Sequence, residues 1–189
     1  MSDERFEEYD RVTDVLSPFS GYGKIDPMIL DRAAARGTRV HNAIHEIITD
    51  LGEWTDTGGI EGYLKSFSSF WDSHEPFVLQ QEQRYFDVPN QLTGQVDLIA
   101  MVNKERVLVD WKTSSQYNCT WPLQGAAYAN LLKAADMNVT KVIFVKLNKD
   151  GKDANVYDFE PAQYLEDFNK CLWAYRKFFR KMKIPTFED

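Results

Sequence analysis

LTGQVDLIAMVNKERVLVDWKTSS, residues 92–115, is the stretch that decides the fold. It holds two mostly apolar runs, 92–102 and 106–113, separated by the polar turn Asn103-Lys104-Glu105. Runs of this length, bounded and separated by polar residues, are typical of two antiparallel strands. We therefore predict a β-hairpin in the middle of the chain.

Two charged residues interrupt the second apolar run. Alternate residues of a strand share a face, so Asp110 and Lys112 are expected to point the same way. Burying either charge alone costs free energy, so the pair requires a salt bridge, a metal or a bound phosphate. A structural ion pair at the end of the strand is the simplest of these alternatives.

A second acid lies on the first strand of the hairpin. Asp97 and Asp110 lie at similar distances from the turn, so we expect them to be near cross-strand partners. Two carboxylates this close repel each other unless a cation lies between them. Carboxylate oxygens with room for water suit Mg²⁺ or Mn²⁺. The hairpin therefore predicts a metal site that contains both acids.

The rest of the chain alternates between helical and strand periodicity. An irregular lead-in, residues 1–26, is expected first. Helices are predicted from Pro27 to about Leu51 (in two pieces separated near Gly37), at 60–72 after a turn at Gly58-Gly59, at 122–136 and at 161–182. Further strands are predicted at 77–88, at 141–147 and, as a short edge strand, at 154–159. This order predicts one α/β domain, residues 1–189, whose central mixed β-sheet is flanked by α-helices on both faces.

Composition and charge restrict the class of protein. A chain of 189 residues with 43% hydrophobic residues and a formal charge of −7 suits a folded domain and argues against a basic protein that coats nucleic acid. An enzyme that holds nucleic acid in a small cleft is not excluded, because local charge governs contact. The chain shows no secretion signal and no run of 18 apolar residues, so we expect a soluble cytoplasmic protein without membrane contact (host cytoplasm if it is viral). Cys119 and Cys171 are too few for an iron–sulfur cluster and are expected to be free thiols.

Two pairs of helical residues, each four positions apart, extend the candidate site. His41 and His45 share one helix face, but HNAIHE is not the HExxH of a zinc protease, so His45 is expected to be structural. Gln124 and Tyr128 share one face of the helix after the second strand. We expect this pair to point toward the same end of the sheet as Asp110, with an ordinary helix face as the alternative.

Taken in chain order, these features resemble the PD-(D/E)XK nuclease superfamily, particularly its RecB-like and phage-exonuclease branch. That branch has an RGTxxH-type helix, a GxxD strand, a DxK strand and a QxxxY helix, which appear here at 36–41, 94–97, 110–112 and 124–128. Each motif alone is common, whereas four in this order and spacing are a specific signal. The resemblance covers residues 11–136. It implies a restriction-endonuclease-like core in a single nuclease domain, with N-terminal helices at 27–72 and the catalytic sheet and QxxxY helix at 77–147.

The resemblance also implies roles for individual residues. Its metal ligands would be His41, Asp97, Asp110 and the carbonyl oxygen of Trp111, with Glu82 as a further candidate. Lys112 would orient the attacking water or stabilise negative charge on the phosphate, and Asp97 and Asp110 would take part in catalysis with it.

Substrate contacts are implied in the same way. Gln124 and Tyr128 would position Lys112 or the substrate phosphate. Arg36 and Arg39 are expected to contact the substrate. Trp121, beside the QxxxY helix, is a candidate for stacking on an unpaired base.

The implied function is that of a Mg²⁺- or Mn²⁺-dependent DNA phosphodiesterase. Within that class we expect an exonuclease that acts on DNA ends or single-stranded regions in recombination, repair or viral replication. No iron–sulfur cluster is expected. A structure-specific endonuclease and a catalytically silent DNA-binding or assembly module of the same fold are the alternatives. A replication or recombination protein is a candidate partner, and the sequence leaves the oligomeric state open. The basic stretch Lys170 to Lys183 is either a DNA-binding face or a solvated helix face.

Overall fold

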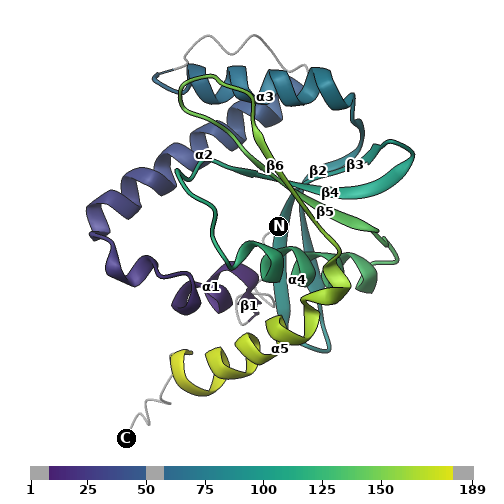
Figure 1. Cartoon of the computed structure of the whole chain (residues 1–189). Helices are drawn as coiled ribbons and strands as arrows, with labels where there is room; N and C mark the ends of the chain where they lie inside the picture. Colours follow the sequence, from purple (N-terminus) through teal and green to yellow (C-terminus); the bar gives the residue numbers. More distant parts are fainter. Residues whose placement is uncertain (1–8, 50–57, 181–189) are drawn as a thin grey trace, which may run out of the picture.

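A computed structural model describes residues 9–49 and 58–180 (Figure 1). In this part of the chain six strands form one mixed sheet in the order β1-β3-β4-β5-β6, with β2 pairing to the other side of β3. The strands are β1 (Asp10–Arg11), β2 (Phe77–Asp87), β3 (Leu92–Val102), β4 (Glu105–Lys112), β5 (Lys141–Lys146) and β6 (Asn155–Phe159). The helices are α1 (Val12–Leu16), α2 (Pro27–Thr49), α3 (Glu61–His74), α4 (Trp121–Ala134) and α5 (Leu165–Ala174). Short 3₁₀ turns occur at η2 (Ser17–Phe19), η3 (Tyr22–Lys24) and η4 (Pro161–Gln163), and a π-helical turn at η5 (Tyr175–Phe179).

The predicted hairpin is present as β3 and β4. The two strands pair antiparallel, from Val102 opposite Glu105 to Leu98 opposite Val109. Asn103 and Lys104 form the turn with φ values of 51° and 68°. Two consecutive residues with positive φ characterise the type I′ turn, whose twist matches that of the flanking strands. The turn is therefore one residue shorter than predicted, and Glu105 belongs to β4.

Helices cover both faces of the sheet. Helices α2 and α3 lie on one side of it and α1, α4 and α5 on the other (Figure 1). Two groups of buried residues match this division: Ile44 and Phe67 from α2 and α3 pack with Trp111 in one, and Leu131 and Phe168 from α4 and α5 pack in the other. This arrangement confirms the predicted α/β class with a central mixed sheet flanked by helices.

Strands β3 and β4 separate beyond their last paired residues. Past Leu98 and Val109, β3 continues to Leu92 beside β2 and also pairs in parallel with β1. Strand β4 instead continues beside β5 as far as Lys112. The sheet therefore opens at the next position on each strand, which is occupied by Asp97 and Asp110.

Two predictions for the N-terminal part of the chain differ from the structure. The lead-in is not irregular throughout, because the α1 residues Val12 and Val15 are buried in the core. Helix α2 runs unbroken through Gly37, because one glycine weakens a helix by only about 1 kcal/mol relative to alanine and does not have to end it. Residues 1–8 and the predicted helix end at Leu51 lie outside the described residues.

The predicted helix at 161–182 is divided into η4, α5 and η5. In the π-helical turn the amide of Arg180 donates to the carbonyl of Tyr175 at 2.8 Å. This turn brings Arg176 Nε to 2.7 Å and Arg180 Nε to 3.2 Å from the two carboxylate oxygens of Asp10, which is 4% exposed. Pairing with a buried acid thus accompanies the departure from regular helix, and residues 181–182 lie outside the described part.

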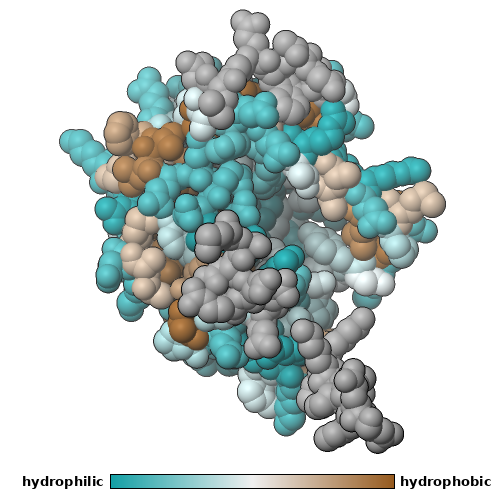
Figure 2. Space-filling model, turned by 180° about the vertical axis from the view of Figure 1, so that it is seen from behind, coloured by the Kyte–Doolittle hydropathy of each residue, from teal (hydrophilic) through white to brown (hydrophobic). Residues whose placement is uncertain are grey.

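The surface is mainly hydrophilic on the face shown in Figure 2, with hydrophobic residues gathered in separate patches. Large apolar side chains that are exposed include Met28, Ile29 and Phe77. Among the helices of the described residues, none has the length and apolar composition to cross a membrane.

Candidate active site

Three acids occupy neighbouring strands where the sheet opens. Glu82 lies opposite Asp97, between the paired positions Gln81–Leu98 and Gln83–Val96, and Asp110 follows on β4. Glu82 has a φ of 50°, a left-handed conformation that costs a non-glycine residue on the order of 1–3 kcal/mol. Its Oε2 accepts a hydrogen bond of 2.7 Å from Gln95 Nε2. Such strain persists where the surrounding structure requires the side chain at that place.

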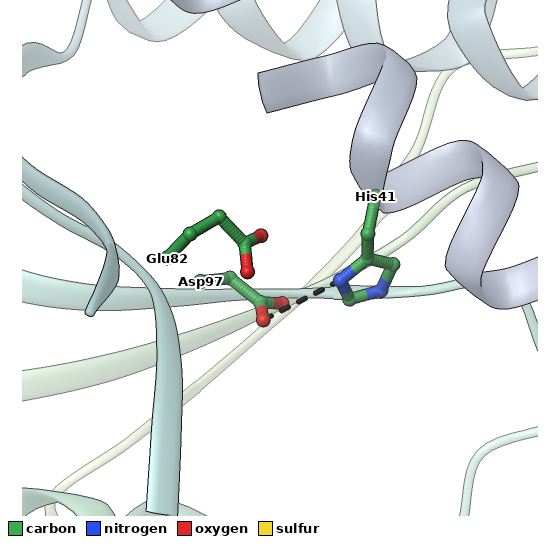
Figure 3. Close-up of side chains that lie close together, drawn as sticks. All are labelled: His41, Glu82 and Asp97. Carbon is green, nitrogen blue, oxygen red and sulfur yellow. Dashed lines mark ion pairs between the residues drawn. The ribbon is translucent and has the colours of Figure 1, made fainter. Parts of the chain in front are cut away.

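His41 joins this group from α2 (Figure 3). Its Nδ1 lies 3.4 Å from Asp97 Oδ1, and its Nε2 lies 3.0 Å from the carbonyl oxygen of Trp111. The amide of Trp111 in turn donates to Asp97 Oδ2 at 2.9 Å. Because β3 and β4 have separated, the Trp111 backbone groups bond to these two side chains instead of to a strand on that side.

The geometry suits a metal ion in one place. Ligand atoms of His41, Glu82 and Asp97 all lie within 4.8 Å of one another. Carboxylate oxygens with one imidazole are ligands that Mn²⁺ and Mg²⁺ sites use. Asp110 does not belong to this group, and its buried Oδ2 is paired with the ammonium group of Lys112. His45 is also outside the group, and its buried Nδ1 has no hydrogen-bond partner among the described residues.

A second set of contacts surrounds the lysine of β4. Lys112 Nζ lies 2.7 Å from Asp110 Oδ2 and donates to Gln124 Oε1 at 3.0 Å. Gln124 Nε2 donates to Asp110 Oδ1 at 3.2 Å and to the Tyr128 hydroxyl at 3.0 Å. The structure thus brings together the four residues of the DxK and QxxxY patterns. Burial strongly raises the pKa of Tyr128, so its hydroxyl keeps its proton.

The glycine of the GxxD pattern has a packing role. A Cβ on Gly94 would lie 2.6 Å from Tyr128 Cε1 and 3.0 Å from Leu131 Cδ1. Carbon atoms do not approach so closely, so only glycine lets the Tyr128 ring lie against β3. This close approach holds the end of the Gln124 network in place.

Aromatic rings cover the lysine on its remaining side. Lys112 Nζ lies 5.2 Å from the ring centre of Phe144 and 5.9 Å from that of Trp121. Ring faces attract cations at such distances. The sequence did not identify Phe144 as a neighbour of the site. Its position follows from the parallel pairing of β4 with β5, in which Phe144 is the partner of Asp110.

Burial and neighbouring charges shift the protonation of the site. Burial lowers the pKa of His41, but the Asp97 carboxylate outweighs it and raises that pKa to about 9. Burial also acts to raise the pKa of Asp97, yet the charge of His41 holds it below its usual value. Burial raises the pKa of Asp110 to about 6 against the opposing effect of Lys112. Burial, and then the charge of Asp97, raise the pKa of Glu82.

The two arginines expected to contact substrate lie on α2, on the N-terminal side of His41. Arg36 Nη2 donates to the carbonyl of Thr113 at 3.4 Å, and its buried Nε has no hydrogen-bond partner within residues 9–49 and 58–180. Arg39 is exposed and donates to the carbonyl of Gly58 at 3.1 Å. Arg36 is thus beside the end of β4, whereas Arg39 is directed toward the segment before α3.

Trp121 does not fit the expected stacking role. It is 3% exposed, and Phe144 is stacked against it with 5.6 Å between the ring centres and 15° between the planes. A base has no access to a ring buried in this way, because the hydrophobic core has already covered it. The exposed aromatic nearby is Tyr117, at 44%, which sequence reasoning missed although it stands alone in the polar loop SSQYN.

The basic stretch is largely neutralised within the described residues. Lys170 Nζ lies 3.0 Å from Glu166 and 2.9 Å from Asp167. Arg176 and Arg180 both pair with the buried Asp10, as described above. These contacts favour the solvated, structurally paired helix face over a DNA-binding face. Lys181 and Lys183 lie outside the described residues.

Comparison with known proteins adds a family match. A family model described as the PD-(D/E)XK nuclease superfamily matches residues 55–188, well over half of the chain. The crystal structure of SSO0001 is similar at 15% identity with a TM-score of 0.42, covering 88% of this chain and 76% of that chain. The crystal structure of LHK-Exo in complex with dAMP is similar at 13% identity with a TM-score of 0.37, covering 92% and 94%. No curated protein matches the chain.

Proposed function

Because the chain belongs to the PD-(D/E)XK nuclease superfamily, we propose that it is a metal-dependent DNA phosphodiesterase and, within that class, an exonuclease. The observation that carries the proposal is the meeting of two sets of side chains where β3 and β4 separate. One set offers oxygen and imidazole ligands, and the other holds the ammonium group of Lys112 beside Asp110. Phosphodiester hydrolysis needs both, because it requires an activated water and compensation for negative charge on the phosphate.

The residues present fit a Mg²⁺ or Mn²⁺ ion. His41, Glu82 and Asp97 would hold it, together with the Trp111 carbonyl oxygen, which lies 3.0 Å from His41 Nε2. Asp110, whose buried carboxylate pairs with Lys112, would join them. When bound, such an ion lowers the pKa of its water and polarises the phosphate oxygens.

Lys112 would stabilise charge on the phosphate. Its side chain is 19% exposed, so little water competes for the ammonium group. Gln124 Oε1 fixes the direction of one N–H, and the Asp110 carboxylate holds the ammonium group close to the ligands. A preorganised donor of this kind costs no reorganisation when charge develops on the substrate.

DNA is the proposed substrate, and Arg36 and Arg39 are the proposed contacts to its backbone. Arginine pairs with phosphate through a planar set of N–H donors. The Arg36 guanidinium lies near the end of β4, where its Nη2 donates to the carbonyl of Thr113. Recombination, repair and viral replication are the processes in which we propose that the enzyme acts, with a replication or recombination protein as its partner.

Cleavage of end-labelled DNA tests the proposed function. The protein is incubated with linear and covalently closed circular DNA in Mn²⁺ or Mg²⁺. Wild type should degrade linear DNA, and Lys112→Ala should lose about 100-fold or more in kcat. Lys133→Ala, a change of an exposed lysine on the last turn of α4, is the matched control and should keep full activity.

Each outcome has a distinct meaning for the proposal. Resistance of closed circles together with degradation of linear DNA supports an exonuclease. Nicking of closed circles would replace it by the structure-specific endonuclease. Metal-independent DNA binding without any cleavage would identify the silent binding module and overturn the proposal.

A further inference from the structure

Tyr117 is an exposed aromatic residue that packs against Trp121, a neighbour of Lys112. It lies in the loop of residues 113–120 that joins β4 to α4, and 44% of its surface is exposed. Single exposed aromatics are common and need no explanation by themselves. The position of this one, and the way in which it is held, distinguish it.

The Trp121 ring lies near both the Tyr117 ring and the ammonium group of Lys112. The centre of the Tyr117 ring lies 5.2 Å from the ring centre of Trp121, which in turn lies 5.9 Å from Lys112 Nζ. Tyr157 packs against Tyr117 with 5.3 Å between the ring centres. A base stacked on Tyr117 would therefore belong to a nucleotide close to the phosphate that Lys112 contacts.

The loop that carries Tyr117 is fixed by polar contacts. Asn118 Oδ1 accepts hydrogen bonds from the amide and the hydroxyl of Thr120, at 2.9 and 2.8 Å. Asn118 Nδ2 donates to the carbonyl of Ser20 at 3.1 Å. Ordering of the loop is thus complete before a ligand arrives, so little conformational entropy is lost on binding.

We propose that Tyr117 is the stacking residue for an unpaired base next to the scissile phosphate and that it gives the enzyme its preference for unpaired strands. This proposal rests on the proposed function and assigns Tyr117 the role that burial denies to Trp121. Stacking on an aromatic ring is available to every base but only when that base is not stacked in a duplex. Tyr117 therefore favours single-stranded or frayed ends without reading their sequence.

The proposal is tested by removing the Tyr117 ring from the protein and, separately, one base from the DNA strand. Steady-state KM is measured for a single-stranded oligonucleotide and for versions that carry one abasic residue at successive positions from the cleaved end. In Tyr117→Ala the KM for the intact strand should rise about tenfold, whereas Tyr117→Phe should resemble wild type. In wild type one abasic position should raise KM by a similar factor, and in Tyr117→Ala that position should have no further effect.

Controls separate this proposal from the proposed function. Phe77→Ala removes an aromatic that is 69% exposed and pairs with Met101 near the hairpin turn, at the far end of β3, and should leave KM unchanged. Blunt duplex DNA should show nearly the same KM with wild type and Tyr117→Ala, which also shows that the variant is folded. Equal KM values for wild type and Tyr117→Ala on single strands, or an equal rise on duplex, would overturn the stacking role while leaving the nuclease intact. Wild type that cuts no DNA would overturn both.

Discussion

The apparent affinity for a divalent metal should rise steeply with pH, because His41 must lose a proton to become a ligand. In the metal-free protein the pKa of His41 is about 9, since Asp97 stabilises the imidazolium. At pH 7 the metal therefore competes with a proton whose pKa lies two units higher, which weakens apparent binding about 100-fold, or ~2.7 kcal/mol. Affinity should increase about tenfold per pH unit from pH 7 and level off above pH 9.

The sign of this effect is opposite for folding without metal. A histidine whose pKa is raised on folding stabilises the native state below its unfolded pKa of about 6.5. That contribution is lost as pH rises through about 9, the pKa in the folded protein. Metal-free protein should therefore become less stable over the same range in which metal binding becomes stronger.

Isothermal titration with Mn²⁺ at pH 6.5, 7.5 and 8.5 measures this directly. Repeating each titration in two buffers with different ionisation enthalpies gives the number of protons released, which should approach one at neutral pH. His41→Asn keeps a small polar side chain but has no proton to lose, so its weaker binding should show a much flatter pH dependence. Affinity in the wild type that is constant across these pH values, without proton release, would refute the assignment of His41 as a ligand paired with Asp97.

Three further changes separate chemistry from stability. Gln124→Leu should lower kcat about 10- to 100-fold with a cooperative thermal unfolding transition retained, because Lys112, the proposed catalytic lysine, loses its acceptor; unchanged kcat would contradict the positioning role. Gly94→Ala places a methyl group 2.6 Å from a Tyr128 ring carbon and should cost about 1–3 kcal/mol in urea denaturation, so wild-type stability would contradict the packing argument. Arg176→Met removes one of two cations from the buried Asp10 and should cost about 3 kcal/mol by the same measurement, whereas a neutral effect would show that the pair contributes nothing net.

The hairpin and the shared face of Asp110 and Lys112 could be predicted because they depend on local periodicity. Alternation predicts that Asp110 and Lys112 share a face, and in the structure they form an ion pair. Asp97 and Asp110 follow the last paired residues of β3 and β4, but the two strands separate there, so the predicted cross-strand pairing is absent from the register of the described residues. The contacts of Gln124 with Lys112 and Asp110 match the expectation that its helix faces this end of the sheet. Where prediction and structure agree, one short-range rule decides the outcome.

Other features depend on contacts between distant segments, which periodicity does not contain. Gly37 is a weak helix former, yet α2 continues through it, and its buried residues Val40 and Ile44 pack against residues of the sheet that lie far away in the chain. Trp121 and Tyr117 are both aromatic residues near the site, and only the packing of β5 and β6 decides which is buried. The separation of β3 from β4 likewise becomes visible only when the pairing of β1 and β5 is known.

That separation explains why structural and chemical requirements meet at one point. When β3 and β4 part, the Trp111 amide and carbonyl lose a strand partner, and a buried backbone group without a partner costs free energy. The Trp111 amide donates to Asp97, and the Trp111 carbonyl lies within hydrogen-bond distance of His41 Nε2. Two proposed metal ligands therefore also serve as hydrogen-bond partners of backbone groups at the edge of β4. In the metal-free state the imidazolium offsets one carboxylate and Lys112 offsets another, which leaves Glu82 as the acid whose pKa is raised without a cation of its own. A divalent ion that enters here replaces a proton on His41 and relieves the repulsion on Glu82, so binding is favoured by the same charges that the fold already holds together.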